Sequence, residues 1–137
     1  MITREADYAI RVILYLSDID SGTTVSTSMM AEEIMVPYRF LRKINRRLAE
    51  AGIIGTSRGK SGGIFLNRKP GEISLYDVIS VFDSRSISLN CCDDEDGKCP
   101  RRDSCTVHFR LNEVQRELDN LLKGADFEQL RTKKAEG

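Results

Sequence analysis

The chain has 137 residues, of which 40% are hydrophobic, and this is enough for one globular domain with a single core. No apolar run reaches the roughly 20 residues that a membrane-spanning helix needs, and charged residues interrupt the N-terminal stretch where a signal peptide would be apolar. Basic and acidic residues number 21 each, so the formal net charge is zero. We therefore expect a cytoplasmic protein whose cysteines stay reduced and favour metal binding or redox chemistry over disulfides.

The zero net charge hides a basic segment between Pro37 and Lys69. It holds nine basic residues and a single acid, Glu50, so its net charge is +8 and the remainder of the chain carries −8. A localised basic stripe on a neutral protein indicates a polyanionic partner such as nucleic acid. The alternative is a helix face that is merely solvated.

Three helices are expected in the N-terminal part. The first, at about residues 3–16, is apolar nearly all round and should be buried on several sides. The second begins at Ser26 or Thr27, either of which can cap it. The third follows Pro37 and ends at Gly52, which suits a left-handed cap. Its apolar positions recur at a helical period and are expected to face the core: Phe40, Leu41, Ile44 and Leu48.

The second and third helices have the spacing of a helix-turn-helix. The apolar residues expected to hold them together are Met30, Ala31, Ile34, Val36, Leu41, Ile44 and Leu48. The other side of the third helix carries cations and no acid before Glu50, which is the division between core and DNA that a recognition helix requires. These cations are Arg39, Arg42, Lys43, Arg46 and Arg47.

A glycine-rich hairpin is predicted next, with short apolar runs at residues 53–54 and 64–66 around a basic tip. Directly after a recognition helix such a hairpin is a wing, in which Arg58 and Lys60 supply charge. Backbone approach to phosphates or to a minor groove would be eased by its glycines, Gly59, Gly62 and Gly63. The stretch GTSRGKS has one residue fewer between its glycines than a phosphate-binding loop needs, so nucleotide binding is not expected.

The C-terminal half is expected to hold a short helix, a loop and a long helix. The stretch GEISLYDVISVFD predicts an amphipathic helix capped by Ser74. The long helix begins near Asp103, and its apolar residues follow a heptad seam: Val107, Leu111, Val114, Leu118 and Leu121. A two-fold partner would bury this seam most simply, and the alternative is packing on its own domain. The polar tail after Gly124 is expected to be loose.

These elements predict a mainly α fold, a winged helix-turn-helix with a small β-hairpin wing and a long C-terminal dimerisation helix. One structural domain would contain four parts. They are the DNA-binding unit at residues 1–83, a cysteine-rich loop at 84–102, the dimerisation helix at 103–124 and the polar tail at 125–137.

The loop and the start of the long helix hold every cysteine and the only histidine: Cys91, Cys92, Cys99, Cys105 and His108. Six residues separate Cys92 from Cys99, and five separate Cys99 from Cys105. A structural zinc site usually uses more closely paired cysteines. Thiolates on a flexible loop with wide spacing suit a larger object, and iron–sulfur clusters are held mainly by cysteine.

The order of these parts closely resembles a known family. The first helix with DYAIRVILYLS, the helix-turn-helix, the wing SRGKSGGIFL and the cysteine loop before a long helix occur together in certain winged-helix repressors. That family includes the iron–sulfur cluster regulator, the nitric-oxide-sensitive repressor and the rhizobial iron regulator. The resemblance covers roughly residues 1–122. It implies a homodimer that binds palindromic promoter DNA, with the recognition helix in the major groove and the wing in the minor groove.

The resemblance also implies a two-iron or four-iron cluster that alters DNA binding. By position, Cys99 and Cys105 match the second and third ligands, and the first is either Cys91 or Cys92. Family members differ in the fourth ligand, which here would be His108 or the partner subunit's Asp7. The residues expected to contact DNA are Tyr38, Arg39, Arg42, Lys43, Arg46, Arg47, Arg58 and Lys60.

Two other functions are alternatives to cluster control. A winged-helix regulator could sense oxidants through thiols alone, with Cys91 and Cys92 as the reactive residues. An enzyme with Cys105 and His108 as a nucleophile pair is not expected, because no third orienting residue or substrate pocket is evident.

Overall fold

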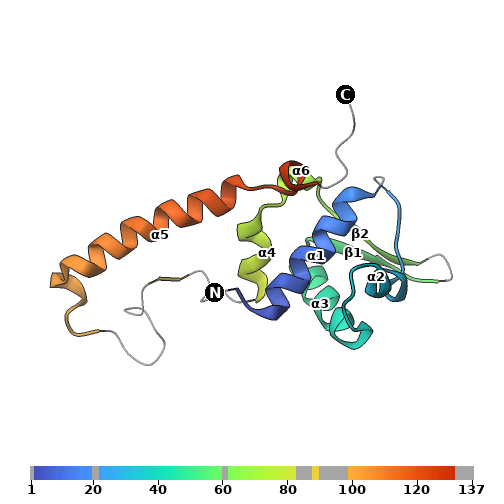
Figure 1. Ribbon diagram of the computed structural model, residues 1–137, viewed down its shortest axis with the longest axis horizontal. Helices are drawn as coiled ribbons and strands as arrows, with labels where there is room; N and C mark the ends of the chain where they lie inside the picture. Colours follow the sequence, from blue (N-terminus) through green and yellow to red (C-terminus); the bar gives the residue numbers. More distant parts are fainter. Residues whose placement is uncertain (1, 20–21, 60–61, 83–87, 90–98, 132–137) are drawn as a thin grey trace.

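The computed structural model describes residues 2–19, 22–59, 62–82, 88–89 and 99–131 (Figure 1). Its helices are α1 (Arg4–Asp18), α2 (Thr27–Glu33), α3 (Tyr38–Glu50), α4 (Leu75–Phe82), α5 (Thr106–Gly124) and α6 (Phe127–Leu130), with short 3₁₀ turns η1 (Pro70–Glu72) and η4 (Arg102–Ser104). Its strands are β1 (Ile54–Ser57) and β2 (Gly63–Leu66), which form one antiparallel hairpin. The predicted mainly α fold with a small wing is confirmed. Figure 1 shows α5 projecting from a body made by the other elements.

Capping side chains, a proline and a glycine set ends of the first three helices. At the start of α1, Thr3 Oγ1 accepts a hydrogen bond from the Ala6 amide at 3.1 Å. Ser26 Oγ does the same for Met29 at 3.2 Å and thereby caps α2. Helix α3 follows Pro37 directly, and the chain leaves it through Gly52, whose φ of +78° lies in the left-handed region.

The core lies where α1, α2, α3, α4 and the hairpin meet. Most residues expected to hold the helix-turn-helix together are at most 3% exposed, namely Met30, Val36, Leu41, Ile44 and Leu48. The expectation that Phe40 faces the core is wrong, because its side chain is 46% exposed. The buried stripe of α3 consists of Leu41, Ile44, Asn45 and Leu48, and Phe40 lies beside this stripe.

The wing is attached to the helix-turn-helix through backbone contacts. Strands β1 and β2 pair with Ile54 opposite Leu66. Strand β2 also pairs with Val25, whose amide donates to the Ile64 carbonyl at 3.0 Å and whose carbonyl accepts from the Ile64 amide at 2.8 Å. A Cβ on Gly63 would collide with the Val25 carbonyl. The fold itself therefore requires this glycine, whatever the wing binds.

Helix α4 is capped as the sequence predicts. The Asp77 amide donates to Ser74 Oγ at 3.2 Å, and the Ser74 amide donates to Asp77 Oδ2 at 3.0 Å. This reciprocal pair satisfies two backbone donors at the helix start.

The expectation of a loose tail is wrong for residues 125–131. Phe127 begins α6 and is fully buried in the core. Its amide donates to the Ile73 carbonyl at 3.0 Å, and the Leu75 amide donates to the Ala125 carbonyl at 2.9 Å. One large apolar side chain and this backbone pairing hold a segment whose other residues are mostly polar.

Helix α5 begins at Thr106, three residues later than expected, after the turn η4. Its C-terminal end lies against α4, where Lys123 Nζ is 4.7 Å from the centroid of the Tyr76 ring. Three seam residues remain exposed in the single chain: Val107 at 61%, Val114 at 36% and Leu121 at 73%. Most of the seam therefore has no cover within one chain. None of the described helices is both long and apolar enough to span a membrane.

Candidate nucleic-acid interface and metal centre

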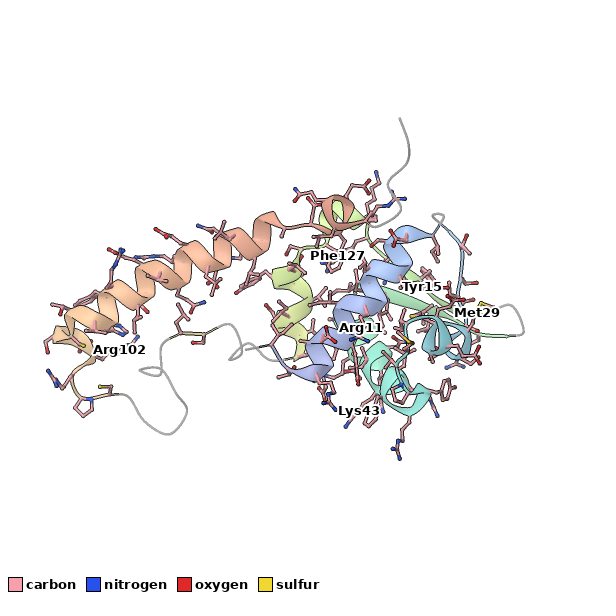
Figure 2. All side chains as sticks on the ribbon, in the orientation of Figure 1. Arg11, Tyr15, Met29, Lys43, Arg102 and Phe127 are labelled. Atoms are coloured by element: carbon pink, nitrogen blue, oxygen red, sulfur yellow. The ribbon has the colours of Figure 1, made fainter. Side chains whose placement is uncertain are left out.

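The outer face of α3 carries the predicted cations. Arg39, Arg42, Lys43 and Arg46 are all exposed, on the side of the helix opposite its buried stripe. Lys43 is labelled on the outer side of α3 in Figure 2. Arg46 Nε lies 3.6 Å from the Glu50 carboxylate, but both side chains are more than two-thirds exposed, so this pair holds the guanidinium weakly. The face remains strongly positive.

Two aromatic residues border this basic face at the start of α3. Tyr38 is 49% exposed and Phe40 is 46% exposed. The Arg42 guanidinium lies 6.0 Å from the centroid of the Tyr38 ring, and that of Arg39 lies 5.3 Å from the Phe40 ring. The period of apolar residues in the sequence groups Phe40 with Leu41, Ile44 and Leu48. The helical wheel was the available signal, since Phe40 falls outside the stripe that the other three apolar residues define.

Arg47 was predicted to contact DNA, but the structure gives it partners within the chain. Its Nη2 donates to the Val81 carbonyl at 2.7 Å, and its Nη1 lies 3.3 Å from Glu5 Oε2. The guanidinium also stacks 4.7 Å from the Phe82 ring centroid. Arg47 therefore connects α3 with α1 and with the end of α4.

The wing tip carries Arg58, which is exposed, next to Gly59, whose φ is +104°. The Gly62 amide donates to the Gly59 carbonyl at 3.0 Å and closes the turn. Lys60, the other predicted wing cation, lies outside the described residues.

Two of the four cysteines lie on the turn that leads into α5. Cys99 and Cys105 are partly buried and carry free thiols. The Cys99 carbonyl accepts from the Arg102 amide at 3.1 Å, and Cys105 is the residue before α5. The Cys105 side chain makes no capping hydrogen bond, so its sulfur is not used by the helix. Cys91 and Cys92 lie outside the described residues.

His108 lies in the first turn of α5 and is buried, with 5% of its surface exposed. Its Nε2 is 3.1 Å from Asn112 Nδ2, and its ring packs edge-on against that of Phe109. The single histidine is therefore positioned within the structure rather than displayed on its surface.

Asp7 lies elsewhere in the same chain. Its Oδ2 is 3.1 Å from Arg11 Nη2 on α1, and its side chain is 43% exposed. In Figure 2, Arg11 lies on the body while Arg102, from the turn that carries the cysteines, lies at the far end of α5. One chain does not bring Asp7 to Cys105 or His108. Among the described residues, no three cysteine, histidine or acidic side chains converge as a metal site.

Comparison with known proteins identifies the family of the chain. Residues 2–133 match the family model Rrf2, described as an iron-dependent transcriptional regulator. The chain is 28% identical over 113 residues to the regulator NsrR of Shouchella clausii, covering 82% of this chain and 76% of that protein.

Two solved structures share the fold. The chain is similar to the global cysteine regulator CymR of B. subtilis, with a TM-score of 0.74, 22% identity and coverage of 95% of both chains. It is equally similar to IscR of T. potens, with a TM-score of 0.74, 19% identity and coverage of 95% of this chain and 85% of that one. The family model spans nearly the whole chain, and the chain belongs to the Rrf2 family of DNA-binding transcriptional regulators.

Proposed function

We propose that this protein is a homodimeric repressor, acting on promoter DNA in the cytoplasm, whose operator binding is controlled by an iron–sulfur cluster. The observation that carries the proposal is the pair of free thiols, Cys99 and Cys105, on the turn into α5, with His108 one turn further. The family's description as iron-dependent regulators supports it. All thiol and imidazole groups of the chain then lie in one segment, residues 91–108.

The basic face of α3 would enter the major groove of a palindromic operator. Arg39, Arg42 and Lys43 are early in the helix, where base edges are usually reached. Arg46 on α3 and the two wing cations, Arg58 and Lys60, would contact phosphates. Arg47 is not assigned to DNA, because its contacts with Val81 and Glu5 hold the guanidinium between α3, α1 and α4.

The residues present fit a cluster in their chemistry. Cys99, Cys105 and either Cys91 or Cys92 would supply thiolates. The fourth ligand would be His108 or the partner subunit's Asp7. When bound, the cluster would supply sensitivity to iron, redox state or nitric oxide. Cys105 directly precedes α5, so ligation of its sulfur would restrain the first turn of that helix.

Dimerisation would link this segment to DNA binding. The exposed seam of α5 can be buried against the same helix of a second copy. A two-fold dimer presents two recognition helices to two half-sites, and its affinity depends on the distance between them. A restraint at the start of α5 can then change operator affinity without touching α3.

Anaerobic purification with iron and sulfide analysis tests cluster binding. The wild type is expected to be coloured, and Cys99→Ala and Cys105→Ala should each lose the visible absorption. Ser104→Ala, a neighbouring exposed residue, is the matched control and should keep it. Of Cys91→Ala and Cys92→Ala, one should behave as a ligand mutant and the other should be nearly silent. Wild-type protein without iron and sulfide, or an intact cluster in all four cysteine variants, contradicts the proposal.

The fourth ligand is tested by His108→Ala and Asp7→Ala, because loss of the true ligand should make the cluster labile or shift its spectrum. Arg11→Ala is the control for Asp7, since it removes the same ion pair and leaves the carboxylate in place. If both single variants keep the wild-type spectrum and lifetime, neither residue is the ligand.

A thiol-based sensor is the second candidate. It is favoured by the free, partly exposed thiols of Cys99 and Cys105 and by the likeness to the cysteine regulator CymR. In that case anaerobic protein would be colourless, and DNA affinity would change when peroxide oxidises the thiols and recover with dithiothreitol.

A further inference from the structure

Two aromatic rings stand exposed on α3 at positions that the core does not use. Successive helix residues are separated by about 100°, so Tyr38 and Phe40 lie on opposite edges of the face centred on Arg39. Each ring is about half exposed. The two rings thus place apolar surface beside the four exposed cations of α3, where a bound partner could bury it.

Each ring is also in cation–π contact with an arginine of the same helix. The guanidinium of Arg39 lies 5.3 Å from the Phe40 centroid, and that of Arg42 lies 6.0 Å from the Tyr38 centroid. Such stacking restrains a long side chain before it meets DNA. Within the described part of the chain, neither guanidinium is paired with an acid. Both arginines therefore keep their N–H donors for a ligand.

The major groove offers an apolar ring one main partner. Among the four bases, only thymine presents an apolar group in the major groove, its C5-methyl. A guanidinium can bind O6 and N7 of a guanine next to that thymine. We propose that Phe40 and Tyr38 contact thymine methyl groups while Arg39 and Arg42 bind neighbouring guanines, so that each operator half-site places thymine next to guanine. This inference rests on DNA binding by α3 and is independent of the cluster.

A uridine scan tests the contact. Operator fragments are first selected from genomic DNA with the full-length protein. Each thymine of a half-site is then replaced by deoxyuridine, which removes only the methyl group. The wild type should bind about fourfold more weakly where a methyl is buried. Phe40→Ala should bind the thymine and uridine forms equally at one such position, and Tyr38→Ala should do so at another.

Two further variants make the result specific. Phe40→Leu keeps an apolar side chain and should retain part of the preference for thymine. Leu130→Ala removes an exposed apolar side chain from α6, away from α3, and should leave the full preference. Both Ala variants should unfold at the wild-type temperature, because Phe40 and Tyr38 are not part of the core.

A wild-type protein that binds every uridine operator as tightly as the thymine form overturns the inference. The same holds if Phe40→Ala and Tyr38→Ala keep the wild-type preference. If the two rings contact another protein instead of DNA, the thymine and uridine operators should bind equally well. A colourless protein without a cluster that still discriminates uridine would refute cluster control and leave the inference intact.

Discussion

At the residue scale, Met35 occupies the turn between α2 and α3 with a φ of +55°. It is the one non-glycine with positive φ among the described residues. Its side chain is 83% exposed, so packing does little to offset the conformation. A residue with a Cβ loses about 1–2 kcal/mol in this region. The turn nevertheless sets how α2 and α3 meet, so the fold keeps the conformation.

Met35→Gly should therefore raise the free energy of unfolding by up to about 1 kcal/mol, because relief of strain exceeds the added chain entropy of glycine. Urea unfolding followed by circular dichroism measures this. Met35→Ala is the control, since it shortens the side chain but keeps the Cβ. Equal stability of the two variants would show that the turn is unstrained.

Arg42 and Arg58 should differ in what they contribute to DNA binding. Arg42→Ala removes a side chain that we propose reads base edges, so it should cost about 1–3 kcal/mol and relax operator specificity. Arg58→Ala should weaken operator and scrambled DNA alike and lower the salt slope by about one. Binding isotherms on both DNAs at several salt concentrations separate the effects. Full selectivity in Arg42→Ala would remove that residue from base reading.

At the element scale, α6 shows how a short polar segment becomes part of the core. Phe127 lies in the core between α1 and η1. These two elements are distant along the chain from Phe127 and from each other. The backbone of residues 125–127 pairs on both sides of Ser74, directly before α4. Helix α6 thereby joins the end of α5 to the winged-helix body.

Phe127→Ala should lower the free energy of unfolding by about 3–5 kcal/mol, as expected for a large aromatic removed from a core. Leu130→Ala, in the same helix but 39% exposed, should cost much less. Chemical denaturation of both variants gives the comparison. Similar losses for the two would show that Phe127 is not part of the cooperative core.

At the scale of the whole molecule, the exposed seam of α5 is the surface proposed to form the dimer interface. Leu111→Asp combined with Leu118→Asp would place two carboxylates in the proposed dimer interface, where burial of unpaired charge is costly. The double variant should sediment as a monomer and lose operator affinity steeply, because each half-site supplies only part of the binding. Arg116→Asp makes the same change in net charge on the opposite side of α5 and should stay dimeric.

A double variant that remains dimeric would show that α5 does not form the interface. A monomer that keeps full operator affinity would instead show that one recognition helix and one wing suffice. The two results affect different parts of the proposal and can be read from the same samples.

The sequence by itself determined the elements from α1 to α5 and their order. Caps such as Thr3, Ser26 and Ser74 act on amides a few residues away, so their effect is readable without the fold. The basic face of α3 follows from helical period in the same way. The chemistry of the cysteine segment also follows from residue type alone, since thiolates favour soft metals and clusters.

Only the tertiary structure decided which residues those faces finally present. Arg47 is held by Glu5 and Val81, which lie 42 and 34 positions away along the chain. Phe127 is buried because the space it fills is formed by α1 and η1, which are distant from it along the chain. Local pattern cannot report such contacts, since their energy depends on neighbours that only folding brings together.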